Sequence, residues 1–202
     1  SLFPSSPGPT AFEGEHPRAR AHRGRTGRPA MSSTRSRGAR NSRAANDWAK
    51  KRAEAIAKAY PDLNIELIGA GIGGHKVPNC QQRLDKDVLQ KKPTIVFIYI
   101  GINDVWHWTH PRVVARGKKG TTPEAFESGL RDMIQKINDI GARVILCTPT
   151  VIGEKPDGAN PDDERLDQYS DINRKVATET SSQLLDLRKG FITYLKEHNC
   201  ST

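Results

Sequence analysis

Long hydrophobic runs are missing from this sequence, and cysteines are few. No stretch approaches the roughly 18 consecutive apolar residues that a membrane-spanning helix needs, which argues against a membrane protein. The three cysteines cannot all pair with one another and show no C-x-x-C spacing, so neither a disulfide framework nor a structural zinc site is indicated. The 202 residues are enough for one compact domain with a hydrophobic core.

Negative charge is scarce in the first 45 residues. They hold nine arginines and no lysine against Glu13 and Glu15, a formal charge of +7 that leaves only +2 for residues 46–202. This segment is rich in Pro, Gly, Ser and Arg, has few apolar residues, and is therefore expected to be disordered. It is either an arginine-rich arm that binds polyanions or an upstream sequence foreign to the fold, with Met31 as a possible start. We favour the second interpretation, so a nucleic-acid partner is not expected.

From Asn46 onward, helical and strand-like patterns alternate. The run of residues 94–100 is continuously apolar between Pro93 and Gly101, which predicts a strand buried on both faces. Strands are also expected at residues 64–70, 143–147 and 183–187. Apolar spacing and caps predict the intervening helices over residues 46–60, after the glycine-rich loop through Leu89, from Thr122 to Gly141, through Leu166, Tyr169, Ile172 and Val176, and finally to His198.

This order predicts an α/β domain over residues 46–202. Helices that separate short hydrophobic strands indicate a parallel sheet with right-handed crossovers, hence a three-layer α/β/α sandwich. In such sheets ligands bind beyond the carboxyl ends of the strands. The loops after residues 70, 100, 148 and 187 are therefore the places to look for a site.

The loop at residues 69–74 matches the G-x-G-x-x-G pattern and raises a dinucleotide-binding hypothesis. That fold also needs an acidic residue at the end of the following strand, whereas residues 94–100 end in Ile100 and Gly101. A tight strand-to-helix turn made by glycines explains the pattern better.

The loop after residues 94–100 reads Gly101-Ile102-Asn103-Asp104 and places a carboxamide at the carboxyl edge of a central strand. Together with the upstream G-I-G-G-H-K-V, 29 residues away from Gly74 to Asn103, this loop resembles the SGNH (GDSL-type) hydrolases over about residues 48–198. The resemblance implies a flavodoxin-like fold, esterase activity and no cofactor. It assigns Gly74 and Asn103 to the oxyanion hole, which stabilises the negative charge that acyl transfer builds on a carbonyl oxygen.

Two other blocks of that family are not found. The family's nucleophile lies in a G-D-S sequence after the first strand, and this chain has no G-D-S anywhere. Ser36 and Ser42 lie in an arginine-rich stretch that does not resemble a strand, so the nucleophile is left unassigned. No D-x-x-H precedes the last helix. We therefore expect an incomplete or misassigned hydrolase that lacks its first central strand, folds poorly and has little or no activity.

One D-x-x-H does occur, at Asp104–His107, but directly after the proposed oxyanion asparagine rather than far downstream. We interpret Trp106, His107 and Trp108 as a substrate-binding rim rather than His107 as a general base. His107 and His110 lack a convincing third ligand, so no metal site is expected. The basic residues that follow are a solvated loop or a substrate-shaping one: Arg112, Arg116, Lys118 and Lys119.

The preferred function is serine-dependent hydrolysis of a small-molecule or carbohydrate ester. The first alternative is a noncatalytic carbohydrate-binding or scaffold domain that uses the Trp106–Trp108 rim, and the second is polyanion binding through residues 1–45. No signal peptide is evident in the chain as given, so a cytoplasmic location is the default. The sequence identifies neither the ester, the compartment nor the oligomeric state.

Overall fold

The computed structural model describes residue 51 and residues 54–56, 58–63, 65–155 and 158–199. All of them belong to one compact unit, Ser36–Thr202. The domain boundary predicted near residue 45 lies outside the described residues, as do Ser36 and Ser42. Among the residues that the structure describes, no helix is both long and hydrophobic enough to cross a membrane.

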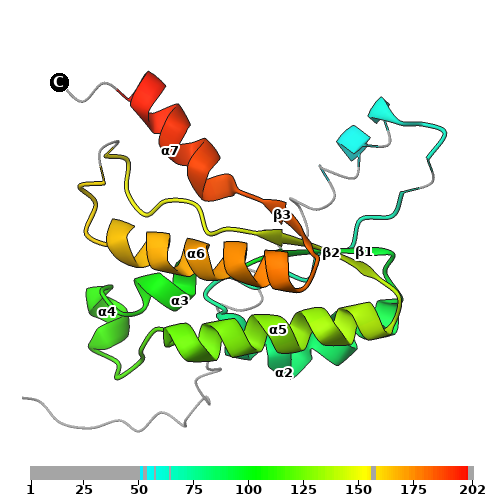
Figure 1. The fold of residues 1–202 in the computed structure, drawn as a ribbon, viewed down its shortest axis with the longest axis horizontal. Helices are drawn as coiled ribbons and strands as arrows, with labels where there is room; N and C mark the ends of the chain where they lie inside the picture. The colour runs from blue at the N-terminus through cyan, green and yellow to red at the C-terminus, as the bar shows by residue number, and fades with distance from the viewer. Residues whose placement is uncertain (1–50, 52–53, 57, 64, 156–157, 200–202) are drawn as a thin grey trace, which may run out of the picture. The chain divides into compact units, whose positions relative to one another are not determined.

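The described residues form a three-stranded parallel sheet in the order β1-β2-β3, as Figure 1 shows. The strands are β1 (Ile95–Tyr99), β2 (Arg143–Cys147) and β3 (Gln183–Leu185). Their register pairs Ile98 with Leu146 and Leu146 with Leu184. The parallel α/β class predicted from the sequence is confirmed, and the carboxyl ends of all three strands lie at one edge.

The longest predicted cap-to-glycine helix begins and ends where its sequence signals indicate. The long helix α5 (Pro123–Asp139) starts after Thr122, whose side chain accepts a hydrogen bond from the Ala125 N–H at 3.3 Å. It ends before Gly141, whose φ of +80° suits a residue without a Cβ. The remaining elements are α2 (Val77–Asp87), the 3-10 turn η1 (Leu89–Lys91), α3 (Ile102–Trp106), α4 (Pro111–Val114), α6 (Asp163–Glu179) and α7 (Leu187–His198).

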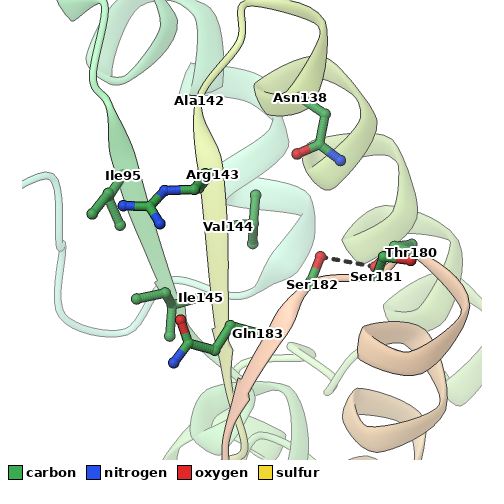
Figure 2. Close-up of a pocket in the computed structure, with 10 residues that line it drawn as sticks. All are labelled: Ile95, Asn138, Ala142, Arg143, Val144, Ile145, Thr180, Ser181, Ser182 and Gln183. Atoms are coloured by element: carbon green, nitrogen blue, oxygen red, sulfur yellow. Dashed lines mark hydrogen bonds between the residues drawn. The ribbon is translucent and has the colours of Figure 1, made fainter.

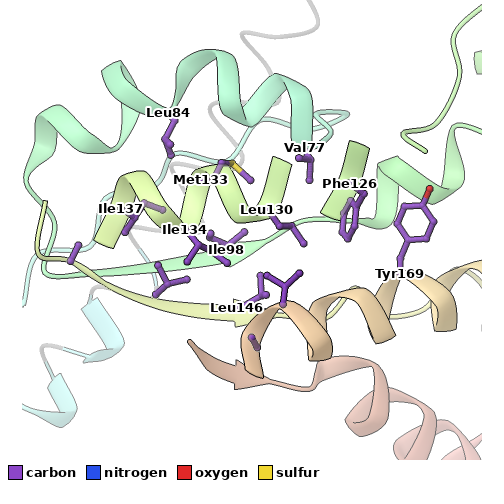
Figure 3. Close-up of a cluster of buried hydrophobic side chains, with 14 of the residues drawn as sticks. Val77, Leu84, Ile98, Phe126, Leu130, Met133, Ile134, Ile137, Leu146 and Tyr169 are labelled. Carbon is purple, nitrogen blue, oxygen red and sulfur yellow. The ribbon is translucent and has the colours of Figure 1, made fainter. Parts of the chain in front are cut away.

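One hydrophobic core lies between the sheet and a helical layer. Helix α5 packs against α2, α6 and β2, and α6 also contacts β2 and β3. Because side chains alternate along a strand, Ile98, Val144 and Leu146 all face this layer and are buried. Figure 3 shows Ile98 and Leu146 against the buried face of α5: Phe126, Leu130, Met133, Ile134 and Ile137.

The opposite face of β1 corrects one prediction. Residues 94–100 were expected to be buried on both faces, but Ile95, Phe97 and Tyr99 are 38%, 59% and 55% exposed. The physical reason is that no described helix covers this face. Moreover, β1 pairs only with β2, and its other edge has no partner strand, among the residues that the structure describes.

The strand predicted at residues 64–70 is also wrong. Residues 65–70 have no regular secondary structure, and Ile65 and Ile68 are 43% and 49% exposed. A strand forms only against a neighbour that pairs with its backbone groups, and apolar composition alone does not supply one. The helix predicted over residues 46–60 is helical at residues 51, 54–56 and 58–59; residues 46–50 lie outside the described part.

Candidate active site

The glycine-rich turn before α2 brings the first site residue into place. Gly74 adopts a φ of +84°, a conformation that residues with a Cβ rarely adopt, and the His75 N–H donates to the Ile72 carbonyl at 3.2 Å. Lys76 then caps α2, and its N–H donates to Asn79 Oδ1 at 3.1 Å. The turn therefore ends at the N-terminus of a helix, with the Gly74 peptide exposed.

The second segment follows β1 directly. Gly101 has a φ of +127°, and a Cβ placed there would lie 3.2 Å from two carbon atoms of Pro149. Only glycine fits this sharp exit from the strand without strain. The chain then enters α3, which carries Asn103 and the fully buried Asp104 in its first turn.

The structure brings these two segments together. Asn103 Nδ2 donates a hydrogen bond to the His75 carbonyl at 3.1 Å, so the carboxamide lies beside the residue that follows Gly74. A second contact lies two residues after His75 and one after Asn103, where the Val77 N–H donates to Asp104 Oδ1 at 3.0 Å. Gly74 and Asn103, which the family resemblance pairs, thus lie on adjoining segments. Their role as oxyanion donors stays a prediction.

Comparison with known proteins identifies the family of this chain. The family model of the GDSL-like lipases and acylhydrolases matches residues 32–198, which is most of the chain. The chain belongs to this family. The predicted membership in the SGNH (GDSL-type) hydrolases is thereby confirmed.

This chain is similar in sequence to two curated relatives. It is 33% identical over 142 residues to an acetylxylan esterase from Geobacillus stearothermophilus, a match that covers 70% of this chain and 63% of the relative. It is 28% identical over 156 residues to the uncharacterized lipoprotein YqeF of Bacillus subtilis (strain 168), covering 68% of this chain and 60% of that protein. The chain therefore spans about three fifths of the length of these relatives.

Solved structures of acetylxylan esterases resemble this chain in fold. The acetyl xylan esterase AlAXEase superposes with a TM-score of 0.68 at 39% identity, over 75% of this chain and 74% of that one. Axe2 from Geobacillus stearothermophilus superposes with a TM-score of 0.65 at 29% identity, over 71% and 64% of the two chains. Structures of Axe2 described as catalytic mutants replace a serine, an aspartate and a histidine by alanine. The likeness confirms the α/β sandwich of the GDSL-type esterases.

Burial is the main cause of the pKa shifts of three side chains near Gly74 and Asn103. Burial raises the pKa of the Asp104 carboxyl above its ordinary value, because a charged carboxylate loses hydration there. Burial also lowers the pKa of His75, and Arg83 adds to this effect. The pKa of His107 is lowered by burial first and then by the positive charges of Lys76 and Lys118.

The predicted rim residues differ in how exposed they are. Trp106 is 37% exposed and meets the His110 ring edge to face at a centroid distance of 4.2 Å. The Trp108 Nε1–H instead donates to the Thr121 carbonyl at 3.3 Å. His107 Nδ1 is buried and has no hydrogen-bond partner among the described residues. Trp106 is thus the most exposed of the three predicted rim residues.

The metal and nucleotide hypotheses receive no geometric support. No group of three or more metal-ligating side chains occurs in the part of the chain that the structure describes. The glycine-rich loop at residues 69–74 follows irregular chain rather than a strand, so the strand-turn-helix context of a dinucleotide site is missing.

Two polar groups near the carboxyl edge of the sheet could not be recognised from the sequence. In the sequence, Asp104 is notable only as part of a D-x-x-H pattern, whereas in the structure it accepts a hydrogen bond from Val77. Arg188, 1% exposed, donates to Thr150 and pairs with Asp163 at 3.0 Å, linking the loop after β2 to α6 and α7. A polar residue carries no sequence signal of burial, since its partner is distant in the chain.

One cavity lies away from this site. It has a volume of about 250 Å³ and sits at the amino ends of β2 and β3, as Figure 2 shows. Polar side chains line much of it, including Asn138, Arg143 and Ser182. Because ligands of parallel α/β sheets bind at the carboxyl ends of the strands, we do not assign this cavity to the esterase site.

Proposed function

We propose that this chain carries the oxyanion-binding part of a serine esterase that removes acetyl groups from a carbohydrate. The observation that supports the proposal is the 3.1 Å contact between Asn103 Nδ2 and the His75 carbonyl, which puts the carboxamide beside Gly74. The acetylxylan esterases among its relatives support the choice of an acetylated carbohydrate as substrate.

The chemistry follows from where charge develops. Attack on an ester carbonyl moves negative charge onto the carbonyl oxygen, and donors held about 3 Å from that oxygen stabilise it. A carboxamide nitrogen has two hydrogens, and His75 receives one of those on Asn103. The second hydrogen and the Gly74 N–H are the two donors that we assign to the oxyanion.

The nucleophile and the base are left unassigned. Three of the four described serines hydrogen-bond elsewhere: Ser128 donates to Ala125 and Ser170 to Leu166, while Ser182 bonds to Thr180. The fourth, Ser181, lines the cavity at the amino ends of the strands. The sequence also contains no G-D-S. We therefore propose that the chain as printed hydrolyses esters weakly or not at all, while keeping the oxyanion donors.

Hydrolysis of p-nitrophenyl acetate and of acetylated xylan tests this proposal. Any turnover above background should be blocked by a serine-reactive phosphonate and should fall ~10²-fold or more in N103A, the usual effect of losing one oxyanion donor. The control is N138A, because Asn138 is exposed at the far end of α5. Turnover that survives both the phosphonate and N103A contradicts the mechanism, and turnover at full enzymatic rates contradicts the proposed weak activity.

A second candidate is noncatalytic binding of a carbohydrate, and the exposure of Trp106 favours it. Aromatic faces bury apolar area against flat partners, sugar rings included. Folded protein that shows no turnover but binds acetylated xylo-oligosaccharides, with binding lost in W106A and kept in F191A, supports this candidate. Phe191 is the matched control because it is a similarly exposed aromatic residue on α7.

A further inference from the structure

Asp104 is a fully buried acid in the first turn of α3, next to the residue that we assign to the oxyanion. We propose that Asp104 is a positioning residue: through its bond to the Val77 N–H it holds the Gly74 turn and Asn103 in one fixed arrangement. This inference rests on the proposed function for its catalytic meaning, but the arrangement can be measured without turnover.

The geometry joins three separate segments at this one residue. Its carboxylate Oδ1 accepts the Val77 N–H at 3.0 Å, which ties α3 to the N-terminus of α2. Its backbone carbonyl accepts the Thr121 N–H at 3.1 Å, which ties α3 to the loop before α5. The packing there is close, since a Cβ on Gly120 would lie 2.2 Å from the same carbonyl.

The side-chain anchor that Asn103 has of its own is the bond to the His75 carbonyl, which is less buried than the Asp104–Val77 bond. The Asn103 side chain is only partly buried, and α3 has just five residues after the unusual backbone turn at Gly101. A short helix of this kind gains little stability from its own hydrogen bonds and depends on tertiary contacts. The Asp104–Val77 bond is buried, and a hydrogen bond with a carboxylate is stronger there than one at the surface.

The consequence is a precise distance between two donors. Val77 lies three residues after Gly74, and Asp104 lies one residue after Asn103. Because Val77 and Asp104 are held together by a hydrogen bond, Gly74 and Asn103 can move apart only a little. Such positioning matters because a displacement of about 1 Å in a catalytic arrangement can cost 10²-fold in rate.

What Asp104 must supply is an acceptor oxygen. An asparagine has a carbonyl oxygen in nearly the same position and can still accept from Val77, whereas alanine cannot. The positioning role therefore predicts that D104N behaves like the wild type and that D104A does not. The matched control is D163A, because Asp163 is also a buried acid with hydrogen bonds but belongs to the Arg188 network.

Heteronuclear NMR on full-length protein labelled with 15N-glycine, 15N-asparagine and 15N-valine tests this directly. In D104A the Gly74 amide and the Asn103 side-chain amide should both leave their wild-type positions, and the Val77 amide should exchange with solvent about tenfold faster or more. In D104N all three should stay near wild type. If D104A does not fold, D104S serves the same purpose, since its hydroxyl is too short to reach Val77.

The outcomes are distinct. If D104A leaves Gly74 and Asn103 unshifted, or if D163A shifts them equally, Asp104 is only a structural residue and the inference fails. On samples with measurable turnover, D104A should lower kcat with little change in KM. Absence of turnover in every sample contradicts the esterase proposal but leaves the NMR comparison to decide the role of Asp104.

Discussion

The side-chain amide of Asn103 donates to the backbone carbonyl of His75 at 3.1 Å, across 28 residues of sequence. This bond orients the carboxamide and leaves one hydrogen free for a ligand. N103D tests the role of this amide, because a carboxylate has no hydrogen to donate. Its negative oxygens would also repel the partly negative carbonyl oxygen of His75. We expect hydrolysis and acetate binding to be lost, and N138D to behave as wild type. Retention of either property in N103D contradicts the assignment.

The buried Asp104 makes stability depend on pH. Its pKa is raised in the folded state, chiefly by burial, from an ordinary value of 3.8. Protonated Asp104 therefore adds to the free energy of unfolding. This stabilisation is complete below pH 3.8 and is lost as the pH rises through the folded pKa of Asp104. Each pH unit that separates the folded and unfolded pKa values corresponds to about 1.4 kcal/mol of unfolding free energy. We expect D104N, which does not ionise, to gain stability relative to wild type from about pH 4 upward. Urea unfolding measures this, and parallel pH curves for the two proteins contradict it.

The buried ion pair of Arg188 and Asp163 is expected to stabilise the packing of α7 on α6. Their side chains are 2% and 6% exposed and lie 3.0 Å apart. R188A leaves an acid buried without its partner and should cost about 3 to 5 kcal/mol of unfolding free energy. R131A is the control, since Arg131 makes ion pairs at the surface, and it should cost less than about 1 kcal/mol. Equal losses in urea titrations would contradict the assignment of Arg188 as a structural anchor.

Gly129 allows α2 to approach α5 closely. A Cβ there would lie 2.3 Å from Val77 Cγ1, so G129A overpacks the contact and should destabilise the fold by about 1 to 3 kcal/mol despite alanine's better helix propensity. At Gly190 in α7 a Cβ meets nothing within 4 Å, so G190A should raise stability by up to about 1 kcal/mol. Thermal unfolding of both variants gives the comparison, and a stabilised G129A contradicts this close packing.

Much of the fold could be predicted from local patterns. The cap at Thr122 and the glycine after α5 marked that helix, and the apolar run before Gly101 marked β1. The predictions for the second face of β1 and for a strand at residues 64–70 were wrong, because burial and strand pairing depend on neighbours that a local pattern cannot reveal.

The site residues differ in the same way. Gly74 and Asn103 could be proposed from family motifs, whose spacing is visible in the sequence. Asp104 could not, because its importance lies in a bond to Val77, 27 residues away, and nothing in its local sequence distinguishes a buried acid from an exposed one.

The central claim is that the Gly74 N–H and the Asn103 carboxamide point at one shared position. The most direct measurement is an acetate titration of 15N-glycine- and 15N-asparagine-labelled protein, because acetate presents the oxygen that these donors would hold. We predict that the Gly74 amide and the Asn103 side-chain amide shift together and saturate with one Kd, while Gly141 and Asn138 at the far end of α5 do not move. Two different Kd values, or no shift at either residue, would contradict the account.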